Sequence, residues 1–377
     1  MLAVSVTVRN PRPGWRNIAS ISLSTTCFIV SWQFGQFMLC TQTCAVFAVH
    51  VLGVLPKESL QSILVAQVIG LLHAVALMFG NEMLFTSWMF STLLSALLVC
   101  LPMDSLLARL SHLPRAIVQV LAFLAITGLA KLAIAKAFLV TDDAHVFDLL
   151  KSKFTDFSSF HTLLYTCAVE FDFLGWEMPW KVTSTLLLPS SLAASLLLTT
   201  SLAAGLWARH RDRPQPLKEI DPAALYNLLQ CLAYGMMAVL IMRLKLFLTP
   251  HLCLLTSLLC APSMTSLGLT RQQHTGLLVA LVAVMSFQGL QNLQEQRAIM
   301  GEYQNVQLEE LVDWINSELP QTAVLAGPMP TMANLLLSTG RPVVNHPHYE
   351  DSGLRDRTKK VYTIFSRRPP SQVWQKL

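Results

Sequence analysis

Long apolar stretches follow one another through most of this chain, and they constrain its fold more than any other feature. A helix needs about 20 predominantly apolar residues to cross a bilayer. We count nine candidate spans, at residues 18–32, 34–54, 60–78, 83–101, 116–140, 184–207, 225–248, 252–269 and 276–290. The pattern therefore predicts an α-helical polytopic membrane protein.

Composition supports this interpretation and excludes two others. Charged residues make up 13% of the 377 residues and hydrophobic residues 53%, whereas an average soluble domain is about 25% charged. Too little charge is present to cover a soluble enzyme, and the hydrophobicity is too high for a disordered chain. All of the eight cysteines except Cys167 lie in apolar stretches, without a CxxC pair. They are typical of small buried side chains rather than of a disulfide or zinc framework.

Two polar segments interrupt the apolar pattern. A loop covers residues 141–182, and a tail of ordinary soluble composition covers 291–377. The tail alternates helix and strand signals, which favours a small α/β domain, although we see no closing strand. We thus predict a cytoplasmic N-terminus at 1–17, a multispanning domain at 18–290 and a small lumenal α/β domain, incomplete, at 291–377.

Basic residues indicate the orientation. They gather before the first span and in alternate loops: Arg9, Arg12, Arg16, Arg109, Arg115, Arg209, Arg211, Arg213, Lys218 and Arg271. Nine crossings place all of them on one side, which the positive-inside rule makes cytoplasmic. The acidic loop and the tail then lie on the opposite side, where we expect the chemistry. The net charge of +5 reflects this loop bias and gives no indication of a nucleic-acid partner.

Two acidic clusters could carry chemistry. Asp142, Asp143 and His145 follow the fifth span, and they could bind a cation, act as an acid or base, or cap the next helix. Glu170 and Asp172 alternate with aromatic residues. In an extended segment their side chains would point the same way. Alternatively, this segment is an interfacial loop whose aromatic residues lie at the membrane boundary.

A basic cluster surrounds the end of the seventh span. Arg243, Lys245 and His251 either bind a phosphate, for which arginine offers a planar fork, or reach toward the headgroups. Arg243 and Lys245 are separated by about 200° on a helix, so we expect one of them, Arg243, to face inward. Lys131 and Lys136 are separated by about 140°, and we expect one to face the bundle and the other the lipid.

A second polar loop follows a strand signal in the tail. His346, His348, Tyr349 and Glu350 lie where α/β folds place ligand contacts, and Asp351 is a candidate helix cap. A His-x-His pair without CxxC or HExxH is a weak metal signal, so we predict no metal site. Because no Gly-rich phosphate loop occurs, a nucleotide enzyme is unsupported.

Several strings resemble the dumpy-nineteen-like protein C-mannosyltransferases, enzymes of the GT-C class in the endoplasmic reticulum. The similarity runs from about residue 31 to 368. The strings that carry it are SWQFGQFMLCTQT near the start, DDAH (142–145), LLYTCAVEFDF (163–173), IMRLKLFLTPH (241–251) and LAGPMPTMANLLLSTGRPVVNHPHYEDSGLRDRTKKVY (325–362).

The resemblance implies transfer of mannose from dolichyl-phosphate-mannose to tryptophan C2 in WxxW-type sites of secretory polypeptides. It implies no cofactor beyond that lipid-linked donor. The catalytic residue is unassigned, with Asp142, Asp143, Glu170 and Asp172 as candidates. For the donor phosphate we name Arg243, Lys245, His251 and His145, and for acceptor or loop contacts His346, His348, Tyr349 and Glu350.

Family members are about twice as long, and the resemblance places their proposed catalytic carboxylate in a first lumenal loop upstream of this region. We therefore expect a fragment or short isoform with weak or no activity alone. The alternative is a non-catalytic membrane scaffold of the endoplasmic reticulum or the nuclear envelope. A transporter ranks lower because few charges are buried mid-span and no inverted repeat is visible.

Overall fold

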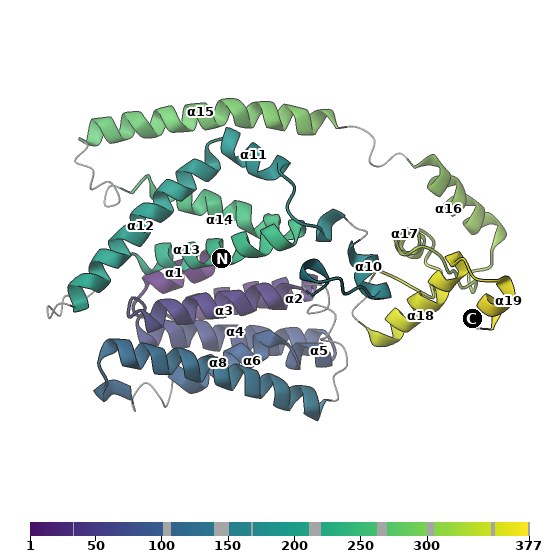
Figure 1. Cartoon of the computed structure of the whole chain (residues 1–377), viewed down its shortest axis with the longest axis horizontal. Helices are drawn as coiled ribbons and strands as arrows, with labels where there is room; N and C mark the ends of the chain where they lie inside the picture. The colour runs from purple at the N-terminus through teal and green to yellow at the C-terminus, as the bar shows by residue number, and fades with distance from the viewer. Residues whose placement is uncertain are drawn as a thin grey trace. The chain divides into compact units, whose positions relative to one another are not determined.

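The computed structural model shows a chain built from helices (Figure 1). It describes residues 1–32, 34–100, 107–138, 151–166, 169–210, 220–261, 270–299, 305–347 and 351–375. The chain divides into two compact units. The large unit comprises Met1–Val140 and Glu170–Gly289, and the small unit comprises Thr141–Val169 and Leu290–Leu377.

Within the described residues, five helices are long and apolar enough to cross a membrane. They are α4 (Lys57–Leu77), α8 (His112–Ala137), α12 (Leu187–His210), α13 (Pro222–Leu240) and α15 (Arg271–Ala298). Two shorter apolar helices, α3 (Gly35–Val51) and α6 (Trp88–Leu98), and the Ser- and Thr-rich α2 (Trp15–Ser31) accompany them. These helices confirm the predicted helical membrane protein, while the count of nine spans stays a prediction.

Short elements connect the long helices of the large unit. They are α1 (Leu2–Arg9), α5 (Glu82–Phe85), η2 (Leu107–Arg109), η3 (Val169–Phe171), α11 (Glu177–Ser184), η4 (Met242–Leu244) and α14 (Lys245–Leu258). Two sequence-predicted spans are interrupted by such elements. The stretch 83–101 is divided between α5 and α6, because the Ser87 hydroxyl caps a new helix by accepting from the Phe90 amide at 3.1 Å.

Close packing of α2 against α4 depends on one glycine. A Cβ at Gly70 would lie 2.7 Å from the Ser22 carbonyl oxygen and 2.7 Å from Thr25 Cβ, which is closer than side chains can approach. The Thr26 hydroxyl hydrogen-bonds with the Gly70 carbonyl at 3.0 Å across this contact. Small residues bring membrane helices together in this way because no hydrophobic effect drives their association in lipid.

A buried chain of polar side chains joins α3, α4 and α13. Thr43 donates to Gln67 Oε1 at 3.2 Å, and Gln67 Nε2 donates to Gln42 Oε1 at 3.1 Å. Gln42 Nε2 in turn donates to the Tyr226 hydroxyl at 2.8 Å. Hydrogen bonds between helices are favoured in an apolar interior because the lipid offers no alternative partners. This chain therefore fixes how the three helices are arranged.

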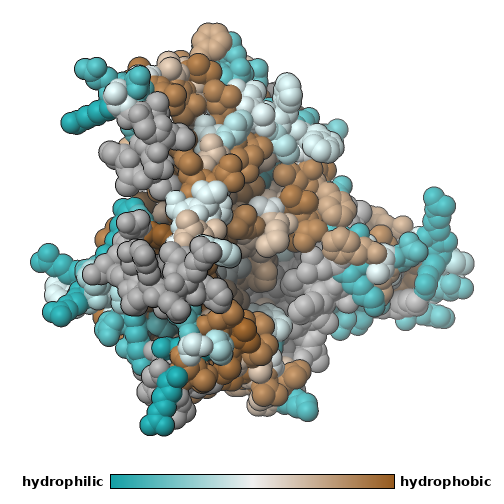
Figure 2. Space-filling model, turned by 60° about the vertical axis from the view of Figure 1, so that its left-hand side comes forward, coloured by the Kyte–Doolittle hydropathy of each residue, from teal (hydrophilic) through white to brown (hydrophobic). Residues whose placement is uncertain are grey.

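The outer surface of the large unit is apolar, as a bilayer requires. Exposed large side chains include Leu72 on α4, Leu121 on α8 and Leu196 on α12, and Figure 2 shows apolar side chains gathered on the surface that it presents. In the most apolar 18-residue stretch of α15, no residue is buried. Such surfaces are suited to lipid rather than to water.

The small unit packs helices around one β-bridge. Its elements are α10 (Phe160–Thr166), α16 (Val306–Glu318), α17 (Met329–Thr339), α18 (Ser352–Tyr362), η6 (Thr363–Phe365) and α19 (Pro370–Trp374). Leu325 and Val343 form an isolated parallel bridge, so the two segments of the tail with strand signals, TAVLAG (322–327) and RPVVN (341–345), meet there. The described residues form no longer strand, and the predicted α/β domain is not confirmed.

Candidate functional site

The predicted span 225–248 is not one helix, and its break creates the candidate site. Helix α13 ends at Leu240, Ile241 is extended with φ −137° and ψ 106°, and Arg243 lies in the short turn η4. A neighbouring loop makes hydrogen bonds at this break. The Met242 amide donates to the Asp172 carbonyl at 2.9 Å, and the Leu174 amide donates to the Val239 carbonyl at 3.1 Å.

These two backbone hydrogen bonds explain why the helix stops. Helix ends leave backbone groups without partners inside the helix, and this loop satisfies one amide and one carbonyl there. Because Glu170 and Asp172 belong to this loop, it also carries the predicted acidic pair to η4. Sequence periodicity could not show that contact, since about 70 residues separate the two segments.

Arg243 lies between two aromatic rings and near one carboxylate. Its guanidinium carbon is 5.6 Å from the Trp32 ring centroid and 5.9 Å from that of Phe171. Its Nη1 lies 3.4 Å from Glu170 Oε2, and both side chains are partly in solvent, exposed by 41% and 63%. With aromatic rings beside it and its side chain partly in solvent, this guanidinium can offer N–H groups to a planar anion.

An aromatic cluster supports this arginine from within the bundle. Trp32 stacks on Phe247 with ring centroids 5.7 Å apart and an interplanar angle of 6°. Tyr234 continues the cluster, 5.4 Å from the Phe247 ring and 4.8 Å from the ring of His251. The cluster draws residues from the end of α2, from α13 and from α14, so the position of Trp32 is fixed by three helices.

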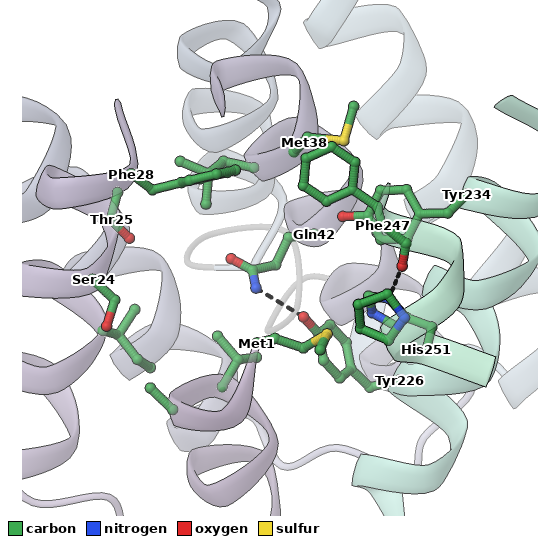
Figure 3. Close-up of a pocket in the computed structure, with 15 residues that line it drawn as sticks. Met1, Ser24, Thr25, Phe28, Met38, Gln42, Tyr226, Tyr234, Phe247 and His251 are labelled. Carbon is green, nitrogen blue, oxygen red and sulfur yellow. Dashed lines mark hydrogen bonds between the residues drawn. The ribbon is translucent and has the colours of Figure 1, made fainter. Parts of the chain in front are cut away.

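His251 belongs to the interior rather than to the arginine's surroundings. Its side chain is 4% exposed, and Nδ1 contacts the Phe247 carbonyl at 2.8 Å. It lines a cavity of about 250 Å³ together with Gln42 and Tyr226 (Figure 3). A carbonyl partner requires Nδ1 to carry the proton, so Nε2 is an acceptor when the ring is neutral. The structure records no hydrogen bond for that buried Nε2 among the residues it describes.

The comparisons with known proteins decide the family. Residues 1–377 match the model of the Dpy19 family, described as Q-cell neuroblast polarisation. The chain belongs to the Dpy19 family. It is 42% identical over 382 residues to the mouse "Protein C-mannosyl-transferase DPY19L1", covering 100% of this chain and 51% of that relative.

Two further relatives agree. The "C-mannosyltransferase dpy-19" of Caenorhabditis elegans is 38% identical over 352 residues, covering 92% of this chain and 50% of the relative. The human "Probable C-mannosyltransferase DPY19L2" is 35% identical, covering 100% and 50%. This Dpy19-family chain thus spans about half the length of the curated relatives it matches.

The structure describes only some of the residues that the sequence singles out. Asp142, Asp143 and His145, and likewise His348, Tyr349 and Glu350, lie outside the described residues. His346 is described in the small unit, where it is partly buried. Lys245 is the first residue of α14, partly buried and two residues beyond Arg243. Of all the predicted site residues, the structure brings Glu170 and Arg243 into direct contact.

The two lysines of α8 differ as predicted. Lys131 is 6% exposed. Its ammonium donates to the Thr86 carbonyl, which ends α5, and lies 5.6 Å from the Trp88 ring centroid. Lys136 is exposed. The buried lysine therefore supports the break between α5 and α6.

Sequence reasoning missed the aromatic residues of the Dpy19-family site. Trp32 ends the predicted span 18–32, and Phe171 is one of the aromatic residues that the interfacial-loop interpretation places at the membrane boundary. One signal was available, namely the density of aromatic residues at 28–37, where the first two predicted spans meet. Nothing in that pattern shows that these rings meet an arginine more than 200 residues later.

Proposed function

We propose that this chain forms the donor-binding part of a protein C-mannosyltransferase, with Arg243 holding the phosphate of dolichyl-phosphate-mannose. The names of the relatives support the activity class. The observation that carries the proposal is the placement of Arg243 beside both Trp32 and Phe171 with its side chain partly exposed to solvent.

We place this site at the lumenal end of the bundle. Helix α2 begins at Trp15, near the basic residues Arg9, Arg12 and Arg16, and ends one residue before Trp32. Helix α13 begins beside Asp221, which pairs with Arg9, and ends three residues before Arg243. Its 19 residues correspond to about 28 Å. If the basic end is cytoplasmic, Arg243 lies at the lumenal headgroup level.

The chemistry requires a cation at the leaving group. The bond between mannose C1 and the phosphate oxygen breaks, a bond from C1 to tryptophan C2 forms, and the indole C2 proton passes to a base. The phosphate keeps the electron pair and departs as dolichyl phosphate. Arg243 stabilises that growing negative charge without donating a proton to it. Asp172 and Glu170, which the structure describes, are candidates for the base or for orienting the indole. Asp142 and Asp143 are further candidates that lie outside the described residues.

Other residues complete the proposed site. Lys245 and His145 add positive charge or a hydrogen bond toward the phosphate, while the buried His251 fixes Phe247 beneath Trp32. The loop with His346, His348, Tyr349 and Glu350 contacts the secretory polypeptide. A lumenal site with a lipid-linked donor and a secretory acceptor places the protein in the endoplasmic reticulum membrane, with nine spans and a lumenal C-terminal unit. Neither metal nor cofactor is part of the proposal.

The direct test uses the whole purified chain in detergent. We expect saturable binding of dolichyl-phosphate-mannose and at least tenfold weaker binding by Arg243→Gln, since charge-assisted hydrogen bonds to an anion are among the stronger ones. Lys136→Gln, which removes an exposed cation from α8, is the matched control and should bind normally. Equal binding by wild type and Arg243→Gln would overturn the proposed phosphate site.

Transfer is tested separately. The same preparation is incubated with the donor and a WxxW peptide, and mass spectrometry checks for a hexose on tryptophan. Hexose transfer that Arg243→Gln reduces supports the activity of this chain. Donor binding without transfer limits the chain to donor recognition.

A further inference from the structure

We propose that Glu170 is an exchangeable counter-ion of Arg243, which occupies the anion position of the empty site and leaves when a lipid phosphate enters. This inference rests on the proposed phosphate site and adds a role for a second residue. The starting observation is the pair itself. Glu170 Oε2 lies 3.4 Å from Arg243 Nη1, whereas charge-assisted N–H···O bonds are usually about 2.7–2.9 Å long.

The loose contact suits exchange. With 63% of its side chain in solvent, the Glu170 carboxylate loses little solvation on pairing and recovers it easily on leaving. Exposed pairs of this kind contribute little to stability. An arginine near a membrane boundary with two aromatic rings beside it nevertheless needs an anion nearby. A weakly held carboxylate meets this need without blocking the ligand.

The surrounding structure does not depend on the pair. The loop is held to the end of α13 through the backbone of Asp172 and Leu174, and Arg243 is held by Trp32 and Phe171. Glu170 can therefore swing away while the loop and the guanidinium keep their places. The phosphate meets a preformed site, and the cost of binding is mainly the loss of the resident carboxylate.

The exchange has a consequence for turnover. The donor is a phosphodiester with one negative charge, whereas the product is a phosphomonoester, which carries close to two at neutral pH. The product therefore binds a lone arginine more strongly than the donor does. A competing carboxylate weakens both complexes and favours release of the polyprenyl phosphate.

A double-mutant cycle tests the exchange in the full chain, with dolichyl phosphate in detergent as the probe. Glu170→Gln should bind it about fivefold more tightly, the effect of removing one exposed competing charge. Arg243→Gln should bind at least tenfold more weakly. Glu170→Gln should have no further effect in the Arg243→Gln background. Glu177→Gln, which neutralises an exposed carboxylate at the start of α11, is the control and should change affinity less than twofold.

The outcomes separate the two proposals. If Arg243→Gln weakens binding but Glu170→Gln leaves it unchanged or weaker, the counter-ion role is wrong and the phosphate site stands. If Arg243→Gln binds as wild type does, the phosphate site itself is wrong and the exchange fails with it. Thermal unfolding of each variant shows whether it is folded, and Glu170→Ala replaces Glu170→Gln if the latter does not fold.

Discussion

The two units of this chain use arginine in opposite ways. Arg341 in the small unit is 1% exposed. Its Nε donates to the Pro320 carbonyl at 3.2 Å, and Nη2 donates to the Leu319 carbonyl at 2.6 Å. Nη1 donates to Asn316 Oδ1 at 2.8 Å. Arg243 in the large unit is 41% exposed on its side chain, with one loose carboxylate contact and two aromatic neighbours.

The difference separates a structural arginine from a binding one. Arg341 satisfies the carbonyl groups that follow the last turn of α16, where the helix dipole also favours a cation. Its donors are used within the fold. Arg243 instead lies beside two aromatic rings and makes one loose contact to a carboxylate, which leaves donors for another molecule. Burial and the number of hydrogen bonds, rather than residue type, therefore indicate which arginine is available to a ligand.

Replacing Arg341 should have the largest effect on stability. Arg341→Gln leaves the carbonyls of Leu319 and Pro320 without their buried donor, at a cost of about 3 kcal/mol. We expect faster proteolysis of the small unit in the full chain, measured by time-resolved cleavage, with unchanged binding of polyprenyl phosphate. Arg357→Gln is the control, because Arg357 makes one exposed hydrogen bond to Val344. Equal cleavage of the two variants would contradict the structural role.

Replacing Arg243 by lysine tests whether the proposed site needs a guanidinium or only a positive charge. Lysine keeps the charge but loses the planar fork and the stacking on Trp32 and Phe171. We expect Arg243→Lys to bind dolichyl phosphate about five- to tenfold more weakly, about 1–1.4 kcal/mol, with no change in thermal unfolding. Titration in detergent gives the dissociation constant. Unchanged affinity would mean that the site recognises the phosphate by charge alone and that the planar guanidinium is not needed.

A third arginine, at the opposite end of α13, provides an intermediate case. The Asp221 side chain accepts from Arg9 Nε at 2.9 Å and also caps α13 by accepting from the Ala223 amide at 3.0 Å. This hydrogen-bonded carboxylate raises the pKa of Arg9. Both side chains are partly exposed, so the pair itself should contribute little.

Two substitutions separate the roles of Asp221. Asp221→Asn keeps a good cap and loses the charge, so we expect a loss of about 0.5 kcal/mol. Asp221→Ala loses both and should cost about 1.5 kcal/mol. Chemical unfolding of the full chain measures both losses. If Asp221→Asn costs as much as Asp221→Ala, the ion pair rather than the cap is the stabilising contact.

The fold was predictable from sequence as far as hydrophobicity decides it. The apolar stretches became helices because an apolar environment satisfies backbone groups only within a helix or a closed barrel. The interruptions were not predictable in the same way. The Ser87 hydroxyl caps the start of a new helix. Helix α13 ends near residues 240–243 because the backbone there is hydrogen-bonded to a loop distant in sequence. Both breaks depend on specific contacts to which average hydropathy is insensitive.

The sequence predicts the charged residues of the candidate site but not the contacts that bring them together. Glu170 and Arg243 stand out in the sequence as ionisable groups beside apolar stretches, and the structure brings them together. The helical angle that predicts only one of Arg243 and Lys245 to face inward does not apply, because Arg243 lies in a turn outside both helices. The roles of these residues stay predictions until binding is measured. Trp32 and Phe171 were not predictable as site residues, because aromatic residues are common at membrane boundaries without any role in binding.

The smallest predicted effect tests whether the aromatic faces matter to the ligand. Trp32→Leu removes one of the two rings beside Arg243, and a cation–π contact at a partly exposed site contributes about 0.5–1 kcal/mol. We expect two- to fivefold weaker binding of dolichyl phosphate. Phe34→Leu is the matched control, since the centroid of the Phe34 ring lies 5.4 Å from that of Trp32 and Phe34 is not one of the two rings beside Arg243. If both variants bind equally, the rings only pack the bundle. If Trp32→Leu alone weakens binding, the ring holds the guanidinium in position for the phosphate, as the contrast with Arg341 requires.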